Sequence, residues 1–200
     1  MNAIANPLDP HNPLPARTLV IIGMPGAGKS SVGRQLAKRL GLSFADSDKE
    51  VESAAGMKIE QIFEQLGEPA FRQGERQVMA RLLEGPPLVL ATGGGAFMDE
   101  STRTLVREHG VSIWLRTDIG DLSERTSRRD NRPLLKQGDP KAVLRKLLAT
   151  REPVYALADI VVTSDQRPVK DTVDRVLKAL DDFARKKPPP VPAAGSVSVK

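Results

Sequence analysis

One stretch near the start of the chain decides the fold, and it reads Thr18-Leu19-Val20-Ile21-Ile22-Gly23-Met24-Pro25-Gly26-Ala27-Gly28-Lys29-Ser30. Its first five residues form a short apolar run, which is typical of a buried strand. Residues 23–30 match the pattern G-x-x-x-x-G-K-[ST] in full. Apolar residues then recur at the spacing of a helix, at Val32, Leu36 and Leu40. The stretch therefore predicts a strand, a phosphate-binding loop and a helix, in that order.

The loop at residues 23–30 carries the chemistry of nucleotide binding. Its glycines let the backbone turn so that N–H groups point at phosphate oxygens, and the N-terminus of the following helix adds a positive dipole. We expect Lys29 to neutralise charge on the β- and γ-phosphates and Ser30 to offer its hydroxyl to Mg²⁺. The alternative is an ordinary glycine-rich turn between a strand and a helix.

The composition of the 200-residue chain narrows the class of protein. Hydrophobic residues make up 40% and charged residues 28%, so we expect one soluble domain with a sizeable core. Aromatic residues make up only 4%, which predicts an aliphatic core. The net charge of +5 suits an anionic partner. Because no basic block stands among aromatic residues, we expect no nucleic-acid binding.

Residue types that the sequence lacks, or nearly lacks, exclude several kinds of site. With no cysteine there is no disulfide, thiolate zinc site or cysteine nucleophile. The two histidines are His11, in a Pro-rich leader, and His109, which we interpret as a helix-end residue before a C′ glycine, Gly110. The longest apolar run, residues 19–22, is too short to span a membrane, and the leader is unlike a signal peptide. We expect a cytoplasmic protein without membrane contact.

Proline content and hydrophobic pattern divide the chain into a leader, one domain and a tail. Residues 1–16 and the Pro-rich residues 186–200 are predicted to be disordered, and they flank a domain at residues 17–185. We expect strands at residues 18–22, 42–45, 88–91, 112–115 and 160–163. We expect helices after the first strand and at residues 49–55, 58–66, 69–84, 101–109, 119–129, 141–150 and 169–183. This alternation predicts an α/β fold whose parallel sheet is covered on both faces and binds ligands at the carboxyl ends of its strands.

Two segments that follow strands are candidates for the acceptor side of a phosphoryl transfer. Gly93-Gly94-Gly95 follows the third strand and lets a ligand approach the backbone closely, although a flexible loop is the alternative. Asp46-Ser47-Asp48 follows the second strand, where Asp46 can face a metal and Asp48 an acceptor. A pair of helix-capping residues is the alternative there. The sequence has no N-K-x-D segment for reading guanine, which argues against a switch GTPase.

Three arginines also stand out. Arg72 follows Phe71, Arg132 opens a polar stretch, and Arg151 is expected at a helix end before Glu152. Taken singly, each is interpreted as a solvated or salt-bridged residue. As a set, they favour an anionic ligand.

Together these segments resemble the shikimate kinase family, from Thr18 to Leu180. The order and spacing of six segments carry the resemblance, and their combination is highly specific. They are residues 23–30, Asp46-Ser47-Asp48, Phe71-Arg72 with Glu75, Thr92-Gly93-Gly94-Gly95, Arg132-Pro133-Leu134-Leu135 and Arg151-Glu152-Pro153-Val154-Tyr155.

The resemblance implies a three-layer α/β/α P-loop kinase fold with a central five-stranded parallel sheet and a mobile lid at residues 128–138. It implies a phosphotransferase with an alcohol acceptor, which uses ATP to phosphorylate the 3-hydroxyl of shikimate on the route to chorismate and aromatic amino acids. ATP and shikimate are the implied partners, Mg²⁺ is the implied cofactor with one ion per subunit, and we expect a monomer.

The resemblance also implies roles for the matching residues. Asp48 would orient or deprotonate the attacking hydroxyl, with Lys29 and Arg132 as the other catalytic residues. The ATP-binding residues would be Gly26, Ala27, Gly28, Lys29, Ser30, Ser31, Arg125, Arg132 and Gln166. The substrate-binding residues would be Asp48, Arg72, Glu75, Gly93, Gly94, Gly95 and Arg151, with the arginines on the carboxylate. Ser30 would bind Mg²⁺ directly, and Asp46 through water.

Two other interpretations stay open at this point. A kinase of the same architecture could act on gluconate or on a nucleoside monophosphate. A non-catalytic nucleotide-binding module is the alternative from a different class, although such a module would be expected to lack some of the catalytic residues.

Overall fold

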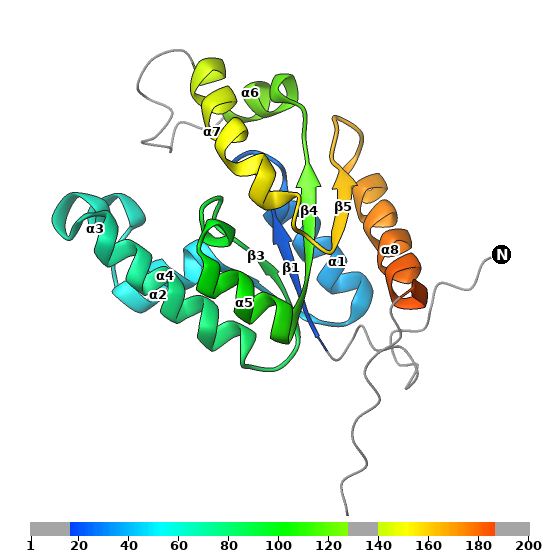
Figure 1. The fold of residues 1–200 in the computed structure, drawn as a ribbon, viewed down its shortest axis with the longest axis horizontal. Coiled ribbons are helices and arrows are strands. Elements are labelled where there is room, and N and C mark those ends of the chain that lie inside the picture. Colours follow the sequence, from blue (N-terminus) through cyan, green and yellow to red (C-terminus); the bar gives the residue numbers. More distant parts are fainter. Residues whose placement is uncertain (1–16, 128–139, 187–200) are drawn as a thin grey trace, which may run out of the picture.

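The computed structural model describes residues 17–127 and 140–186 of the chain. They form a five-stranded parallel sheet with strand order β2-β3-β1-β4-β5, covered by helices on both faces (Figure 1). The strands are β1 (Thr18–Ile22), β2 (Ser43–Asp46), β3 (Leu88–Ala91), β4 (Gly110–Arg116) and β5 (Ile160–Thr163). The expected α/β class and the five-stranded parallel sheet are therefore confirmed.

The helices form the two outer layers. They are α1 (Lys29–Leu40), α2 (Ser47–Ala55), α3 (Ile59–Gln65), α4 (Gly67–Leu83), the short 3₁₀ helix η2 (Ala96–Met98), α5 (Glu100–His109), α6 (Ile119–Ser127), α7 (Pro140–Tyr155) and α8 (Val169–Lys186). α1 and α8 pack together on one face of the sheet. α5 packs on β4 and on α4 at the other face, where α7 also lies (Figure 1).

β1 is the centre of the core. Its residues from Leu19 to Ile22 are completely buried, and it pairs with β3 on one side and β4 on the other. A strand covered on both faces needs apolar side chains at every position, which explains the unbroken run in the sequence. The phosphate-binding loop thus begins at the end of the buried central strand of the sheet.

Several helices extend further than expected, and two of these extensions concern expected site residues. α2 begins at Ser47 rather than at residue 49, so Asp48 lies in the first helical turn, where a carboxylate is stabilised by the helix dipole. α7 continues past the expected end at residue 150 and includes Pro153, so the expectation that Arg151 lies at a helix end is wrong. Pro153 has no N–H, so the last turn of α7 lacks one helical hydrogen bond.

The interpretation of Gly110 as a left-handed C′ glycine is also wrong. Its backbone is extended, with φ −136°, and it begins β4 by pairing with Thr18. A β-carbon on Gly110 would lie only 2.9 Å from the carbonyl oxygen of Thr18. The close approach of the two strands therefore explains the glycine better than a helix cap does.

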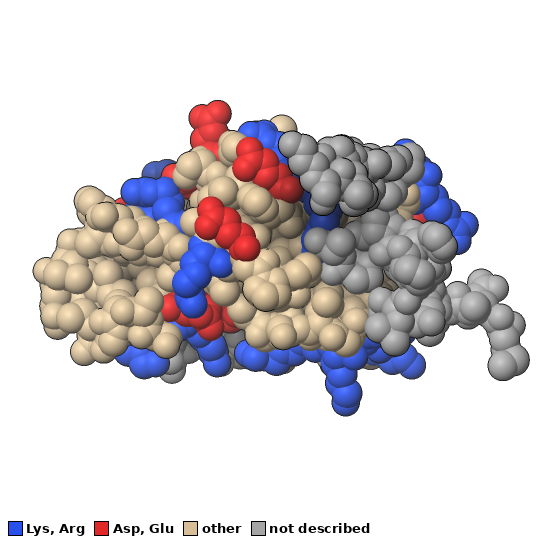
Figure 2. Space-filling model, turned by 90° about the horizontal axis from the view of Figure 1, so that it is seen from below, with Lys and Arg blue, Asp and Glu red and all other residues tan. Residues whose placement is uncertain are grey.

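The described surface is charged but mixed in sign. Figure 2 shows one face, on which Lys and Arg side chains line the lower edge and recur along the upper edge, with Asp and Glu side chains interspersed near the centre and at the top. Within residues 17–127 and 140–186, no helix combines the length and the apolar character needed to cross a bilayer.

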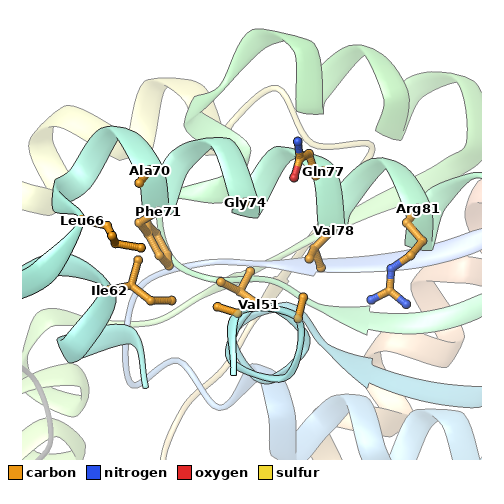
Figure 3. Close-up of a pocket in the computed structure, with 11 residues that line it drawn as sticks. Val51, Ile62, Leu66, Ala70, Phe71, Gly74, Gln77, Val78 and Arg81 are labelled. Carbon is orange, nitrogen blue, oxygen red and sulfur yellow. The ribbon is translucent and has the colours of Figure 1, made fainter. Parts of the chain in front are cut away.

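One side of helix α4 lines an apolar groove, and another side carries Arg72 and Glu75. On one side, Phe71 and Val78 face an apolar groove of about 370 Å³ between α2, α3 and α4, with Val51 on the opposite wall (Figure 3). The Phe71 ring also contacts Phe63, with 4.8 Å between ring centroids. Packing on this side fixes the rotation of α4 and turns Arg72 and Glu75 toward the carboxyl end of β3.

Candidate active site

The phosphate-binding loop, residues 23–30, connects β1 to α1 and depends on glycine at three positions. Gly23, Gly26 and Gly28 have positive φ values of 144°, 88° and 90°, a backbone conformation in which other residues are strained. The Nζ of Lys29 donates hydrogen bonds to the carbonyl oxygens of Gly23 and Met24, at 2.9 and 3.0 Å. The lysine is therefore folded back over its own loop, at the position where phosphates would lie.

Ser30 and Asp46 form a pair of oxygen donors beside this loop. The Ser30 hydroxyl donates a 2.6 Å hydrogen bond to Oδ2 of Asp46, at the carboxyl end of β2. Asp46 stands at the N-cap of α2, yet its side chain makes no capping hydrogen bond, which argues against the capping interpretation. A hydroxyl and a carboxylate are hard oxygen ligands of the kind that Mg²⁺ prefers, so the two residues fit this ion.

The glycine turn, residues 93–95, is surrounded by the charged side chains that the sequence singled out. A β-carbon on Gly93 would lie 2.5 Å from Oδ1 of Asp48 and 3.0 Å from Oε1 of Glu75. One on Gly95 would lie 2.7 Å from Nη1 of Arg72. None of the three glycines has a positive φ, so it is the lack of a side chain, and not an unusual backbone, that this turn requires.

Arg72 is held by two carboxylates of its own helix. Its Nη1 donates to Oε2 of Glu75 at 2.8 Å, and its Nη2 donates to Oε1 of Glu68 at 3.0 Å. Glu75 is buried, and burial raises the pKa of its carboxyl, with the nearby charge of Asp48 adding to the rise and Arg72 opposing it. The expected contact between Glu75 and Arg72 is present, and it orients the guanidinium toward the glycine turn.

Arg151 reaches the glycine turn from the other side, on α7. A β-carbon on Gly94 would lie 3.0 Å from Nη1 of Arg151 and 3.1 Å from Cδ of Pro25 in the phosphate-binding loop. Tyr155, one helical turn further along α7, donates a 2.5 Å hydrogen bond to the carbonyl oxygen of Gly94. Gly94 therefore lies between the arginine and the loop, with no room for a side chain.

The residues expected to border the adenine gather at the far end of the loop. Arg125, on α6, donates to the Ser164 hydroxyl at 3.4 Å and to the carbonyl oxygen of Asp165. Its Nη1 would lie 3.8 Å from a β-carbon on Gly28. Gln166 is tied by its amide nitrogen to Asp121 and Glu124, at 2.8 and 3.0 Å. Arg125 thus lies beside the loop, and Gln166 is tied to the helix that carries Arg125.

Of the other expected site residues, some belong to the described part of the chain and one, Arg132, does not. Gly26, Ala27 and Ser31 belong to the loop and the start of α1, where Ser31 is exposed. Arg132 and the expected lid, residues 128–138, lie outside the described residues, so their roles stay predictions.

Three contacting residues carry no expected role. The Ser47 hydroxyl accepts a 2.8 Å hydrogen bond from the N–H of Gly93, and Glu68 and Tyr155 make the contacts described above. Ser47 and Tyr155 lie inside motifs that the sequence displays. The spacing of four between Arg151 and Tyr155 would have placed both on one helix face if α7 had been expected to continue.

A loop that binds phosphates, set against carboxylates and arginines that can hold a small anionic acceptor, defines a small-molecule kinase of the P-loop class. The sequence model of a family described as shikimate kinase matches residues 25–181. The chain is 56% identical over 164 residues to the shikimate kinase of Paramagnetospirillum magneticum, covering 82% of this chain and 84% of that protein. It is 54% identical over 168 residues to the shikimate kinase of Caulobacter vibrioides, covering 84% of each.

Solved structures agree with these sequence matches. A shikimate kinase from Acinetobacter baumannii in complex with shikimate has a TM-score of 0.81 at 37% identity, over 85% of this chain and 96% of that one. A gluconokinase from Sinorhizobium meliloti has a TM-score of 0.59 at 20% identity over 86% and 95% of the two chains, which is a likeness of fold alone. The chain belongs to the shikimate kinase family.

Proposed function

We propose that this protein transfers the γ-phosphoryl group of ATP to the 3-hydroxyl of shikimate and releases ADP and shikimate 3-phosphate, on the route to chorismate and aromatic amino acids. One observation carries the proposal: the glycine turn lies beside the phosphate-binding loop, so close that a β-carbon on Gly94 would lie 3.1 Å from Cδ of Pro25. An acceptor on the turn would therefore lie beside a phosphate in the loop. Phosphoryl transfer depends on such proximity and on neutralised phosphate oxygens more than on covalent chemistry by the protein.

On the acceptor side, the proposal assigns opposite ends of shikimate to different residues. Arg72 and Arg151 approach the glycine turn with planar guanidinium groups, which suit a carboxylate. Asp48 lies at the same turn and can accept a hydrogen bond from a hydroxyl of the acceptor. Glu75 keeps Arg72 in place. Asp48 would thereby hold the attacking oxygen toward the loop and take up its proton late in the transfer.

On the nucleotide side, Lys29 would exchange its hydrogen bonds with loop carbonyls for phosphate oxygens. Ser30 would hold Mg²⁺ directly and Asp46 through water, in keeping with their 2.6 Å contact. When bound, Mg²⁺ would neutralise charge on the β- and γ-phosphates. We also propose that Arg125 and Gln166 border the adenine, that Arg132 adds a positive charge at the phosphates, and that residues 17–185 act as one monomeric domain in the cytoplasm.

An assay of ADP release with different acceptors tests the proposed function. We expect ATP turnover to depend on shikimate and to be negligible with gluconate or a nucleoside monophosphate. Good turnover of gluconate beside negligible turnover of shikimate would overturn the choice of acceptor. No turnover with any acceptor, despite tight ATP binding, would favour the non-catalytic module.

The role of Asp48 is tested separately by Asp48→Asn. If Asp48 is the base that takes the proton of the attacking hydroxyl, its replacement slows the chemical step and lowers kcat. If the variant keeps most of kcat and raises only the KM for shikimate, Asp48 positions the acceptor without acting as a base.

A further inference from the structure

Tyr155 is buried beside the candidate site and has a polar group with a defined direction. Its side chain is 1% exposed, and its ring lies 5.9 Å from the ring of Trp114. Its hydroxyl donates to the carbonyl oxygen of Gly94. Burial raises the pKa of this phenol, with Arg151 opposing the rise, so the hydroxyl keeps its proton at neutral pH. The contact joins α7 to the glycine turn.

The geometry of a peptide bond gives this contact a consequence. The carbonyl of Gly94 and the N–H of Gly95 belong to one planar, trans peptide group and point in opposite directions. Holding the carbonyl oxygen of Gly94 therefore fixes the direction of the N–H of Gly95. Ser47 holds the preceding part of the turn in the same way, by accepting a 2.8 Å hydrogen bond from the N–H of Gly93.

The same hydroxyl also interacts with the guanidinium of Arg151, which precedes Tyr155 by one turn of α7. Arg151 lies next to Gly94. The buried hydroxyl thus holds the backbone at Gly94, and the arginine one helical turn away on α7 reaches the same glycine. If the side chain of Tyr155 only filled the core, its ring would be enough, and its hydroxyl would have no role.

We propose that Tyr155 is a positioning residue for the carboxylate end of the acceptor, because it orients the peptide group after Gly94 and the guanidinium of Arg151 together. The inference rests on the proposed function, which assigns the carboxylate of shikimate to Arg72 and Arg151 at the glycine turn. Tyr155 itself does not touch the reacting atoms. Its loss should weaken acceptor binding and leave the nucleotide side unchanged.

The variant Tyr155→Phe tests this inference, because it removes the hydroxyl and keeps the ring against Trp114. We expect the KM for shikimate to rise about tenfold, since a buried carbonyl loses its partner and an arginine loses its support. We expect kcat and the KM for ATP to change less than about twofold, because neither the reacting hydroxyl nor the loop is touched. Ser112→Ala is the matched control: its buried hydroxyl donates a 2.7 Å hydrogen bond to Asp159 and accepts one from the N–H of that residue.

A second substrate makes the test specific for the carboxylate. With a shikimate analogue that carries a carboxamide in place of the carboxylate, Tyr155→Phe should lose much less than with shikimate, because the two changes remove the same interaction. Equal losses with both substrates would contradict the inference and indicate a general structural role. An unchanged KM for shikimate in Tyr155→Phe, with normal turnover by the wild type, would also contradict it.

The outcome that contradicts the proposed function is different. If the wild type turns over no shikimate, the proposed function fails, and the inference fails with it.

A measurement on the unmutated chain covers the case in which Tyr155→Phe does not fold. Tyr155 is the single tyrosine of the sequence, so labelling with 3-fluorotyrosine gives one fluorine resonance for the full-length protein. We expect this resonance to shift on saturation with shikimate and to shift much less with the carboxamide analogue. A resonance that moves equally with both, or with neither, would overturn the inference.

Discussion

The Ser30 hydroxyl donates its 2.6 Å hydrogen bond to Asp46 across the gap between two neighbouring elements, the start of α1 and the end of β2. Both residues therefore stand at the same edge of the sheet, within reach of one ion. The contact also keeps the carboxylate beside the loop before any ligand arrives.

Replacing Asp46 by Asn should weaken the use of Mg²⁺. The amide loses the negative charge that would act through a metal-bound water, and loss of such an outer partner lowers metal affinity about 10- to 100-fold. We expect the Mg²⁺ concentration for half-maximal ADP release to rise by that factor, while the KM for shikimate at saturating Mg²⁺ stays near the wild-type value. An unchanged requirement for Mg²⁺ would remove Asp46 from the metal site.

Lys29→Ala should abolish most of the activity. The ammonium group is the charge that lies closest to the carbonyl oxygens of Gly23 and Met24, where the phosphates are proposed to bind. Loss of one such fixed positive group lowers kcat about 100- to 1,000-fold. Circular dichroism checks that the variant folds. A variant that folds and keeps wild-type turnover would contradict the proposed mechanism.

Gly93→Ala should block the acceptor and leave the fold intact. Because φ at Gly93 is not positive, alanine fits the backbone, yet its β-carbon would lie 2.5 Å from the carboxylate of Asp48. We expect turnover of shikimate to be lost while ATP binding, measured by calorimetry, is kept.

Gly74→Ala is the control for this glycine. Gly74 lies within α4, and a β-carbon there would meet nothing within 4 Å. Alanine is preferred to glycine inside a helix by about 1 kcal/mol, so this variant should keep its activity and unfold at a slightly higher temperature. If Gly74→Ala also loses activity, the loss of turnover in Gly93→Ala is not caused by the lack of space for a side chain at Gly93.

Glu75→Gln should separate stability from activity. The pKa of Glu75 is raised above its ordinary value by burial, so the folded state disfavours the ionised form. Glu75 makes its full contribution to the stability of the fold when the pH is below the pKa that its carboxyl has in the unfolded chain. That contribution is lost as the pH rises through the pKa that the carboxyl has in the folded protein. Glutamine has no such titration.

The Tm of Glu75→Gln relative to wild type should therefore increase from about pH 4 toward neutral pH, the range above the ordinary pKa of a glutamate. At neutral pH the KM for shikimate should rise, because Arg72 loses a charged partner at 2.8 Å. Thermal unfolding across this pH range and steady-state kinetics check the two effects. A Tm difference that falls with pH would show that Glu75 is stabilised in its ionised form.

The sequence was sufficient where a signal is local. β1, β3 and β5 begin and end where expected, because their apolar runs are bounded by glycine, proline or polar residues. β4 extends beyond its expected ends, because Gly110 and Arg116 join the sheet only through pairing with β1 and β5. Pairing of this kind depends on the tertiary structure, which no local pattern reports.

The candidate site shows the same division. Asp48, Arg72 and Arg151 belong to motifs, and the structure brings all three to one turn. The roles of Ser47 and Tyr155 depend on hydrogen bonds to the backbone of residues more than 40 positions away. No pattern in the sequence of either segment predicts such a contact between the two.

The strand order gives the acceptor side a divided origin. Asp48 and the glycine turn come from the ends of β2 and β3, which lie together on one side of β1, whereas Arg151 and Tyr155 arrive from α7, after β4 has crossed to the other side. Exchange of one continuous chain segment between two such kinases would therefore transplant only part of the acceptor specificity. A change of acceptor would therefore involve substitutions in two distant stretches of the sequence, one around β2 and β3 and one in α7.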